Sequence, residues 1–109
     1  MSEKHDEKIQ KLQLFEQNAQ QLLAQRQQFQ TQLIEIDSAL AEIDKTKESY
    51  KIIGNIMVST SKEDLKKELK EKKTMVDIRV KSIEKQEKEV KDKAKKLQEE
   101  VLKGLEQKK

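Results

Sequence analysis

The side chains that could act as catalysts or metal ligands are few in this sequence. His5 is the only histidine, it lies close to the start of the chain, and there is no cysteine. We expect His5 to be a solvated side chain in a frayed terminus rather than a ligand. The carboxylates alternate with lysines, which is typical of solvated helix faces and not of paired acid/base groups. With no glycine-rich phosphate loop and no metal-ligand spacing, the sequence predicts no enzyme activity, no cofactor and no metal.

A second chemistry is nucleic-acid binding through basic and aromatic side chains. Residues 1–55 carry 7 basic and 9 acidic groups, whereas residues 56–109 carry 17 and 12. The basic bias of the second half is diluted by interspersed acids, and the only arginines are Arg26 and Arg79. The three aromatic residues are not grouped as a stacking platform. We therefore expect no nucleic-acid partner.

The composition leaves two broad possibilities for the fold. Of the 109 residues, 41% are charged and 33% are apolar, the formal net charge is +3, and proline is absent. These values fit either a disordered chain or long solvated helices, so periodicity has to decide. No apolar run approaches the roughly 20 residues of a membrane span, and no signal peptide is recognisable. We expect a cytoplasmic chain with no membrane partner.

Apolar residues in the first half recur at alternating steps of three and four, which is the heptad pattern of a coiled coil. The seam positions are Leu12, Phe15, Ala19, Leu22, Arg26, Phe29, Leu33, Ile36, Leu40, Ile43, Lys47 and Tyr50. Arg26 and Lys47 interrupt the apolar seam, and their methylene stems can lie along it. The pattern predicts a helix over about residues 4–48.

The second half repeats the pattern. Its seam positions are Leu69, Lys73, Val76, Val80, Ile83, Glu87, Val90, Ala94, Leu97 and Val101. Acid-before-base pairs four residues apart line its surface: Glu63/Lys67, Glu68/Lys72, Glu84/Lys88, Glu87/Lys91, Asp92/Lys96 and Glu99/Lys103. Each pair favours a helix by about 0.2–0.5 kcal/mol. Thr60 with Glu63, or Ser61 with Asp64, fits a capping box. We predict a helix over about residues 62–106.

Between the two helices lies an apolar, β-branched cluster with Gly54 and Asn55 at its centre. Glycine at the first central position suits a type II′ turn, so we predict a β-hairpin over about residues 50–59. A plain helix–helix loop is the alternative. Because side chains alternate along a strand, both hairpin faces would be apolar, and two helices could cover only one.

An isolated hairpin is marginally stable and its edges attract further strands, so we expect several chains to join their hairpins into a shared β-barrel. The residues expected to form it are Tyr50, Lys51, Ile52, Ile53, Gly54, Asn55, Ile56, Met57 and Val58. The predicted fold is mostly α: a single domain, residues 1–109, in which an antiparallel coiled-coil helical hairpin carries one central β-hairpin.

Apolar residues also gather where the first helix begins and the second ends, remote from the predicted hairpin. Helix ends fray, and a frayed seam presents apolar surface to a partner. Gly104 favours this interpretation because glycine loosens a helix. The alternative, equally compatible with the pattern, is that these residues only complete the coiled coil. The residues in question are Ile9, Leu12, Leu14, Phe15, Leu97, Val101, Leu102 and Leu105.

Three stretches of the sequence are similar to one known family. They are the Gln-rich segment 12–43, the Tyr-Lys-x-x-Gly motif that opens segment 50–58, and the segment 82–90. On these the chain resembles the β-type subunits of archaeal prefoldin. The single hairpin matches the β type, because α-type subunits carry two between their helices.

The resemblance implies a hexamer of two α-type and four β-type subunits whose hairpins form a double β-barrel. It implies an ATP-independent chaperone (holdase) that binds non-native proteins with its coiled-coil tips and transfers them to a group II chaperonin. One departure is that the second strand fades into Ser59 and Thr60, which would shorten the barrel edge. The alternative function is a structural or tethering coiled-coil oligomer, or a filament-forming relative.

Overall fold

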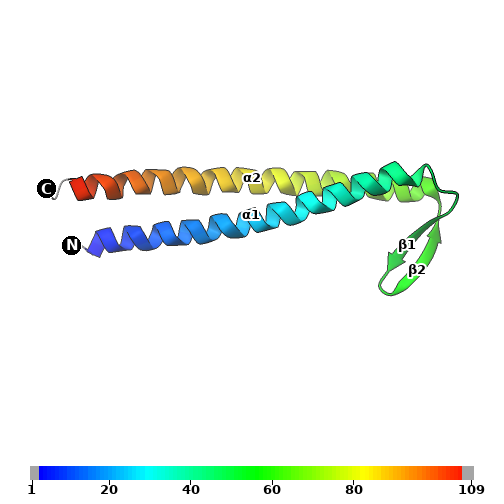
Figure 1. Cartoon of the computed structure of the whole chain (residues 1–109), viewed down its shortest axis with the longest axis horizontal. Helices are drawn as coiled ribbons and strands as arrows, with labels where there is room; N and C mark the ends of the chain where they lie inside the picture. Colours follow the sequence, from blue (N-terminus) through cyan, green and yellow to red (C-terminus); the bar gives the residue numbers. More distant parts are fainter. Residues whose placement is uncertain (1–2, 107–109) are drawn as a thin grey trace. The chain divides into compact units, whose positions relative to one another are not determined.

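A computed structural model describes residues 3–106 as two long helices connected by a β-hairpin (Figure 1). Helix α1 spans Glu3–Ile43, strand β1 spans Ser49–Ile53, strand β2 spans Ile56–Thr60 and helix α2 spans Lys62–Glu106. The predicted fold class, mostly α with one central hairpin, is confirmed. Within these residues, neither helix has a segment that is both long and apolar enough to span a bilayer.

The chain divides into two compact units. We call the first the terminal unit, which comprises Met1–Gln27 and Ser82–Lys109. The second is the central unit, Gln28–Lys81, which includes the hairpin. Each unit contains one stretch of α1 and one of α2.

Most of the buried apolar residues lie in the central unit, and one, Ile83, lies in the terminal unit. Ile36 of α1 is buried against Val76 and Val80 of α2. Half-buried residues packed against this cluster are Phe29, Leu33, Leu40 and Leu69. All of these are predicted seam positions, so the alternating spacing of three and four correctly identified the face that each helix buries. The guanidinium of Arg79 lies 5.6 Å from the centre of the Phe29 ring and covers its outer side.

Helix α1 ends at Ile43, five residues before the expected end at residue 48. The backbone N–H of Lys45 donates to the carbonyl of Glu42 at 3.0 Å, and the hydroxyl of Thr46 donates to the carbonyl of Ile43 at 3.1 Å. These turn contacts satisfy the last carbonyls and stop the helix. The assignment of Lys47 and Tyr50 to the helical seam was therefore wrong.

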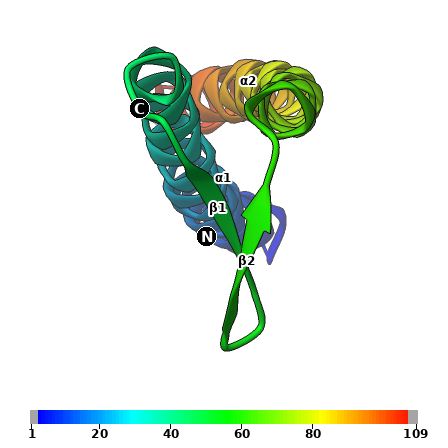
Figure 2. The ribbon, with the colours of Figure 1, turned by 90° about the vertical axis from the view of Figure 1, so that its right-hand side faces the viewer.

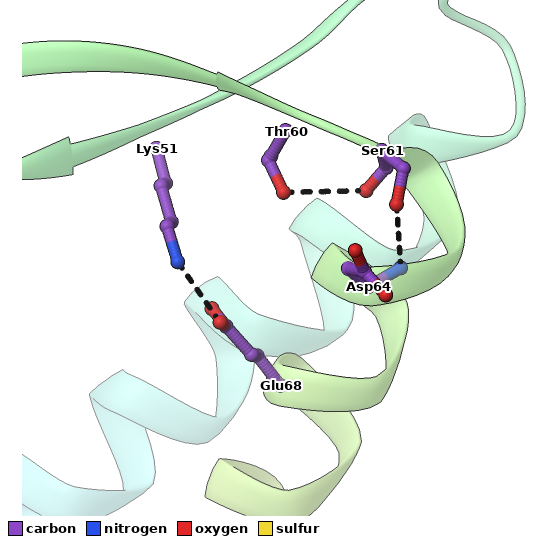
Figure 3. Close-up of polar contacts among 5 residues, drawn as sticks. All are labelled: Lys51, Thr60, Ser61, Asp64 and Glu68. Atoms are coloured by element: carbon purple, nitrogen blue, oxygen red, sulfur yellow. Dashed lines mark hydrogen bonds and ion pairs between the residues drawn. The ribbon is translucent and has the colours of Figure 1, made fainter.

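Helix α2 begins as one of the two capping alternatives predicts. The backbone N–H of Asp64 donates to the hydroxyl of Ser61 at 3.2 Å, so Ser61 is the N-cap (Figure 3). The N–H of Leu65 donates to the carbonyl of Ser61 at 3.0 Å, which closes the first turn. The hydroxyl of Thr60 instead donates to the Ser61 carbonyl at 3.5 Å, and Thr60 itself is the last residue of β2.

Most of the ion pairs connect distant parts of the chain rather than neighbours on one helix, and the exception is the local pair of Lys45 with Glu42. In the described part of the chain, none of the six expected pairs on α2 lies within ion-pair distance. Lys73 of α2 instead contacts Asp37 of α1 at 2.7 Å, and this hydrogen bond raises the pKa of Lys73. Lys73 occupies a seam position, where an unpaired charge would be unfavourable. The carboxylate of Asp37 on the opposite helix pairs with it.

Replacement of Ile36 by alanine tests the importance of the central core. Ile36 is 5% exposed, so Ile36→Ala removes buried methyl groups and leaves a cavity. We expect its free energy of unfolding to fall by about 2–4 kcal/mol. The matched control is Ile34→Ala, because Ile34 is two residues away and 67% exposed. Its effect should stay within about 0.5 kcal/mol in the same chemical denaturation experiment; equal losses from both variants would contradict the assigned seam.

Candidate functional site

The hairpin is two strands joined by a two-residue turn. Ile53 pairs with Ile56, and the register continues to the pair of Ser49 with Thr60. Gly54 has φ of +61°, whereas Asn55 does not have a positive φ. Because a type I′ turn needs positive φ at both central residues, this turn is type II′, as predicted.

The hairpin is one residue longer at each end than the predicted range 50–59. Ser59 pairs with Tyr50, and Thr60 pairs with Ser49. The expected fading of the second strand at Ser59 and Thr60 is therefore wrong. Their hydroxyl side chains do not prevent pairing, because the ladder is made by backbone groups.

Both faces of the hairpin expose apolar side chains. Ile52 and Met57 lie opposite each other on one face and are 71% and 66% exposed. Ile53 and Ile56 lie on the other face and are 58% and 67% exposed. Figures 1 and 2 show the hairpin projecting away from the helices of the central unit, with its turn farthest from them. The helices of that unit therefore leave both of its faces uncovered near the turn.

Of the other hairpin residues, Val58 lies opposite Lys51 and is a further exposed apolar side chain, and polar groups lie nearer the base. Lys51 contacts Glu68 of α2 at 2.9 Å (Figure 3), and so holds one face of the hairpin against the helix. The hydroxyl of Tyr50, itself exposed, donates to the Glu48 carboxylate; this hydrogen bond, and then desolvation, raises the pKa of Tyr50. Ser49 is buried, and its hydroxyl has no hydrogen-bond partner in the described part of the chain.

Among the described residues, the sheet consists of β1 and β2 alone. Each strand therefore has one paired edge and one open edge. Open edges carry unpaired backbone N–H and C=O groups, which can accept a further strand. The hairpin thus offers two kinds of unfilled contact, apolar faces and backbone edges.

The terminal unit has a looser seam than the central unit. Leu12, Phe15, Leu97 and Val101 are half-buried seam residues, and none of them is fully enclosed. Ile9, Leu14 and Leu102 lie beside the seam and are exposed. The side chain of Leu105 lies outside the described residues.

The looser seam leaves an apolar groove between the two helices of the terminal unit. The groove has a volume of about 660 Å³. Its residues are Leu12, Phe15, Glu16, Ala19, Glu87, Val90, Lys91, Ala94, Lys95 and Gln98. The expected tip residues Leu12 and Phe15 are therefore brought together at one hollow, while Ile9, Leu14 and Leu102 do not line it.

A half-buried charged pair joins the two helices across the seam of the terminal unit. The Nε of Arg26 donates to the carboxylate of Glu87 at 2.6 Å, and the two side chains are 26% and 23% exposed. This hydrogen bond is the main cause that raises the pKa of Arg26. The prediction that the methylene stem of Arg26 can lie along the seam did not identify Glu87 as its partner, although both residues are seam positions.

His5 is buried, contrary to the expectation of a solvated side chain in a frayed terminus. It lies in α1, and its Nδ1 is 3.8 Å from the point where a Cβ on Gly104 would stand. The heptad pattern contains the signal that was missed. His5 is seven residues before Leu12 and Gly104 is seven residues after Leu97, so both continue the seam.

Comparison with known proteins agrees with this geometry. The family model described as prefoldin subunit matches residues 6–108, nearly the whole chain. The chain belongs to the prefoldin subunit family. Prefoldin is a family of chaperones rather than of enzymes, and this chain is accordingly a chaperone subunit.

The individual relatives are prefoldin β subunits from archaea, which confirms the predicted resemblance to the β type. Prefoldin subunit beta of Pyrobaculum calidifontis is 36% identical over 89 residues, which cover 79% of this chain and 71% of the relative. That of Archaeoglobus fulgidus is 37% identical over 87 residues, covering 77% and 75%. The crystal structure of the prefoldin beta subunit from Thermococcus strain KS-1 superposes with a TM-score of 0.88 at 30% identity, covering 95% of this chain and 94% of that one.

An ion pair at the base of this prefoldin hairpin predicts a pH dependence of stability. The carboxylate of Asp44 accepts a hydrogen bond from Lys66, which is the main cause that lowers the pKa of Asp44. A lowered folded-state pKa stabilises the fold above the unfolded-state pKa, and this contribution is lost as the pH falls through the folded-state pKa. In thermal unfolding, the Tm of wild type should therefore be higher than that of Asp44→Asn at about pH 7. At about pH 2 the two Tm values should be equal.

The matched control repeats this comparison in a Lys66→Gln background. There, Asp44→Asn should change the Tm much less at neutral pH, because the partner that lowers the pKa of Asp44 is gone. An Asp44→Asn effect that is the same at both pH values, or unchanged by Lys66→Gln, would contradict the assigned pair.

Proposed function

We propose that this prefoldin subunit acts as an ATP-independent holdase in a hexamer of two α-type and four β-type subunits. Its hairpin residues, Tyr50 to Val58, would form the shared β-barrel. The apolar residues at the helix ends would bind non-native client proteins, which the complex then passes to a group II chaperonin. The cytoplasmic location expected from the sequence is part of this proposal.

The observation that carries the assembly is the exposure of both hairpin faces. Exposed apolar patches of this kind mark contact surfaces, and a two-stranded sheet is marginally stable in water. Pairing with hairpins of other subunits would bury Ile52 and Met57 on one face, and Ile53 and Ile56 on the other. It would also fill the open strand edges.

The half-open seam of the terminal unit supports client binding at the helix ends. In the central unit the seam residues Ile36, Val76 and Val80 are buried, but the corresponding positions of the terminal unit are mostly half-buried. Apolar surface that the chain does not bury is available to an unfolded segment of another protein. Several weak contacts from different subunits would then combine through effective concentration, so that release needs competition and no nucleotide.

A charge placed on the hairpin tests the assembly. Ile52→Lys with Met57→Lys should prevent formation of the hexamer, because the barrel would have to bury two lysines without partners. Native mass spectrometry after mixing with an α-type prefoldin subunit measures the result. Wild type should convert to one hexameric species, whereas the variant should remain in smaller species.

The matched control for assembly places the same charges on equally exposed helix residues. Ile34 and Ile78 are 67% and 62% exposed, so Ile34→Lys with Ile78→Lys adds the same charge outside the hairpin. This control should still form the hexamer. A wild-type chain that stays a monomer or simple dimer and ignores the α-type subunit would favour the alternative of a tethering coiled coil.

Polar substitutions at the helix ends test client binding. Ile9→Ser, Leu14→Ser and Leu102→Ser together change exposed residues beside the seam, so the helix pair should stay intact. We expect about fivefold more of this complex to be needed to suppress aggregation of a denatured protein, because weak contacts act jointly. Light scattering during dilution of the denatured protein measures the effect.

The control for client binding is Leu23→Ser, Ile34→Ser and Ile78→Ser, which changes three exposed apolar residues elsewhere on the helices. It should suppress aggregation as well as wild type does. If wild-type hexamer leaves aggregation unchanged, the holdase assignment is wrong and a passive scaffold becomes the better account.

A further inference from the structure

Apolar side chains and lysines occur together in the hollows that flank the seam of the terminal unit. The floor of the 660 Å³ groove is formed by five apolar residues: Leu12, Phe15, Ala19, Val90 and Ala94. Its volume is within the range of about 300–1,000 Å³ that is usual for sites that bind a ligand or a short chain segment. The groove is therefore large enough to take several side chains of another protein.

Two lysines and two glutamates line this groove, and Arg26 adds a third positive charge beside one of the glutamates. Lys91, Lys95, Glu16 and Glu87 line it. The carboxylate of Glu87 is already engaged by Arg26 at 2.6 Å. The two lysines therefore face only one other carboxylate, that of Glu16, and the rim is positive.

A second hollow repeats this chemistry on the other side of the seam. It has a volume of about 220 Å³, and its residues are Lys11, Phe15, Lys93, Lys96, Leu97 and Glu100. Lys11 and Lys93 each precede a seam residue in the sequence, whereas Glu16 and Lys91 of the first groove each follow one, so the two hollows lie on opposite sides. The one carboxylate here, Glu100, contacts Lys8 at 3.6 Å.

Five lysines thus surround an apolar floor without a carboxylate partner of their own. Within the described residues, no ion pair within 4.0 Å involves Lys11, Lys91, Lys93, Lys95 or Lys96. We call these five residues the lysine rim. Unpaired lysines also occur elsewhere on the described helices, for example Lys67 and Lys88, so the lysine rim is distinguished by its place beside the hollows.

We propose that the lysine rim makes this chaperone selective for non-native segments in which apolar side chains alternate with acidic ones. The inference rests on the proposed holdase function and adds that the charge of a client segment determines how tightly it binds. Apolar side chains of such a segment would enter the hollows, and its carboxylates would meet the lysines at the edge. A basic segment of equal hydrophobicity would bring like charges together, which disfavours binding.

A third hollow lies beside the same seam and supplies main-chain partners. It has a volume of about 340 Å³ and is lined by amides, namely Asn18, Gln21, Gln25 and Gln86, together with Leu22, Glu89, Val90 and Lys93. Amide side chains both donate and accept hydrogen bonds, so they can pair with the backbone of an extended segment whatever its sequence. Selection by charge therefore falls to the lysine rim.

Three unfolded peptides of equal length test this proposal. They share the same Leu and Phe residues, and their remaining positions are all Glu, all Gln or all Lys. We measure their dissociation constants from the assembled hexamer by fluorescence anisotropy. The Glu peptide should bind about tenfold more tightly than the Lys peptide at about 50 mM salt, and the difference should shrink at about 500 mM salt because the contacts are screened.

The decisive variant replaces the lysine rim by glutamine: Lys11→Gln, Lys91→Gln, Lys93→Gln, Lys95→Gln and Lys96→Gln. It should lose the preference for the Glu peptide and keep its affinity for the Gln peptide. The control removes the same charge from five exposed lysines of α2 that line none of these hollows: Lys67→Gln, Lys72→Gln, Lys81→Gln, Lys85→Gln and Lys88→Gln. This control should keep the preference.

The outcomes separate this inference from the function on which it rests. If wild-type hexamer binds all three peptides equally and still prevents aggregation, the charge selectivity is wrong while the holdase function stands. A preference that both lysine variants lose equally would be an effect of net charge, and the lysine rim would have no special role. If no peptide binds and aggregation is unchanged, the proposed function itself is wrong.

Discussion

The structure depends on one constraint: a pair of helices can bury only a narrow stripe of side chains. Among the residues whose burial is described, five apolar ones are buried, namely Ile36, Ile43, Val76, Val80 and Ile83, whereas thirteen large apolar ones are exposed. In a compact domain of this length a shared core would enclose most of them. Here the chain closes one short part of the seam and leaves the hairpin and the terminal unit with unfilled apolar surface. The proposed assembly and the proposed client binding both use apolar surface that this seam cannot bury.

Most of the fold could be predicted from two features of the sequence, the heptad spacing of the apolar residues and the glycine at the turn. Seam positions such as Ile36 and Val80 could be identified because the 3-4 alternation is the direct signature of a two-helix seam. Gly54 could be assigned to a hairpin turn because two-residue hairpin loops favour primed turns, and a type II′ turn has glycine at its first central position. The end of α1 could not be found in this way. Lys47 and Tyr50 happen to continue the spacing, and periodicity does not reveal where local hydrogen bonds such as that of Thr46 stop a helix.

The candidate sites were predictable only in part, because a seam pattern tells which residues face the partner helix and not how closely the helices pack. The 660 Å³ groove of the terminal unit is lined by two small seam residues, Ala19 and Ala94. Neither the groove nor its lysines could be derived from the pattern alone. His5 was misjudged for a different reason: a polar residue at a seam position was taken for part of a frayed end. Its seven-residue distance from Leu12 was the better guide.

Charged pairs between the helices favour one register over its alternatives, and register determines which side chains share a hollow. Arg26 with Glu87 in the terminal unit and Lys73 with Asp37 in the central unit each join α1 to α2 across or beside the seam. Such pairs add little stability, since desolvation offsets much of their attraction, but a shifted register would leave their charges without partners. An apolar seam of Leu and Val tolerates a shift far better. Within the terminal unit, the pair of Arg26 with Glu87 therefore favours the register in which Phe15, Val90 and Ala94 line one groove.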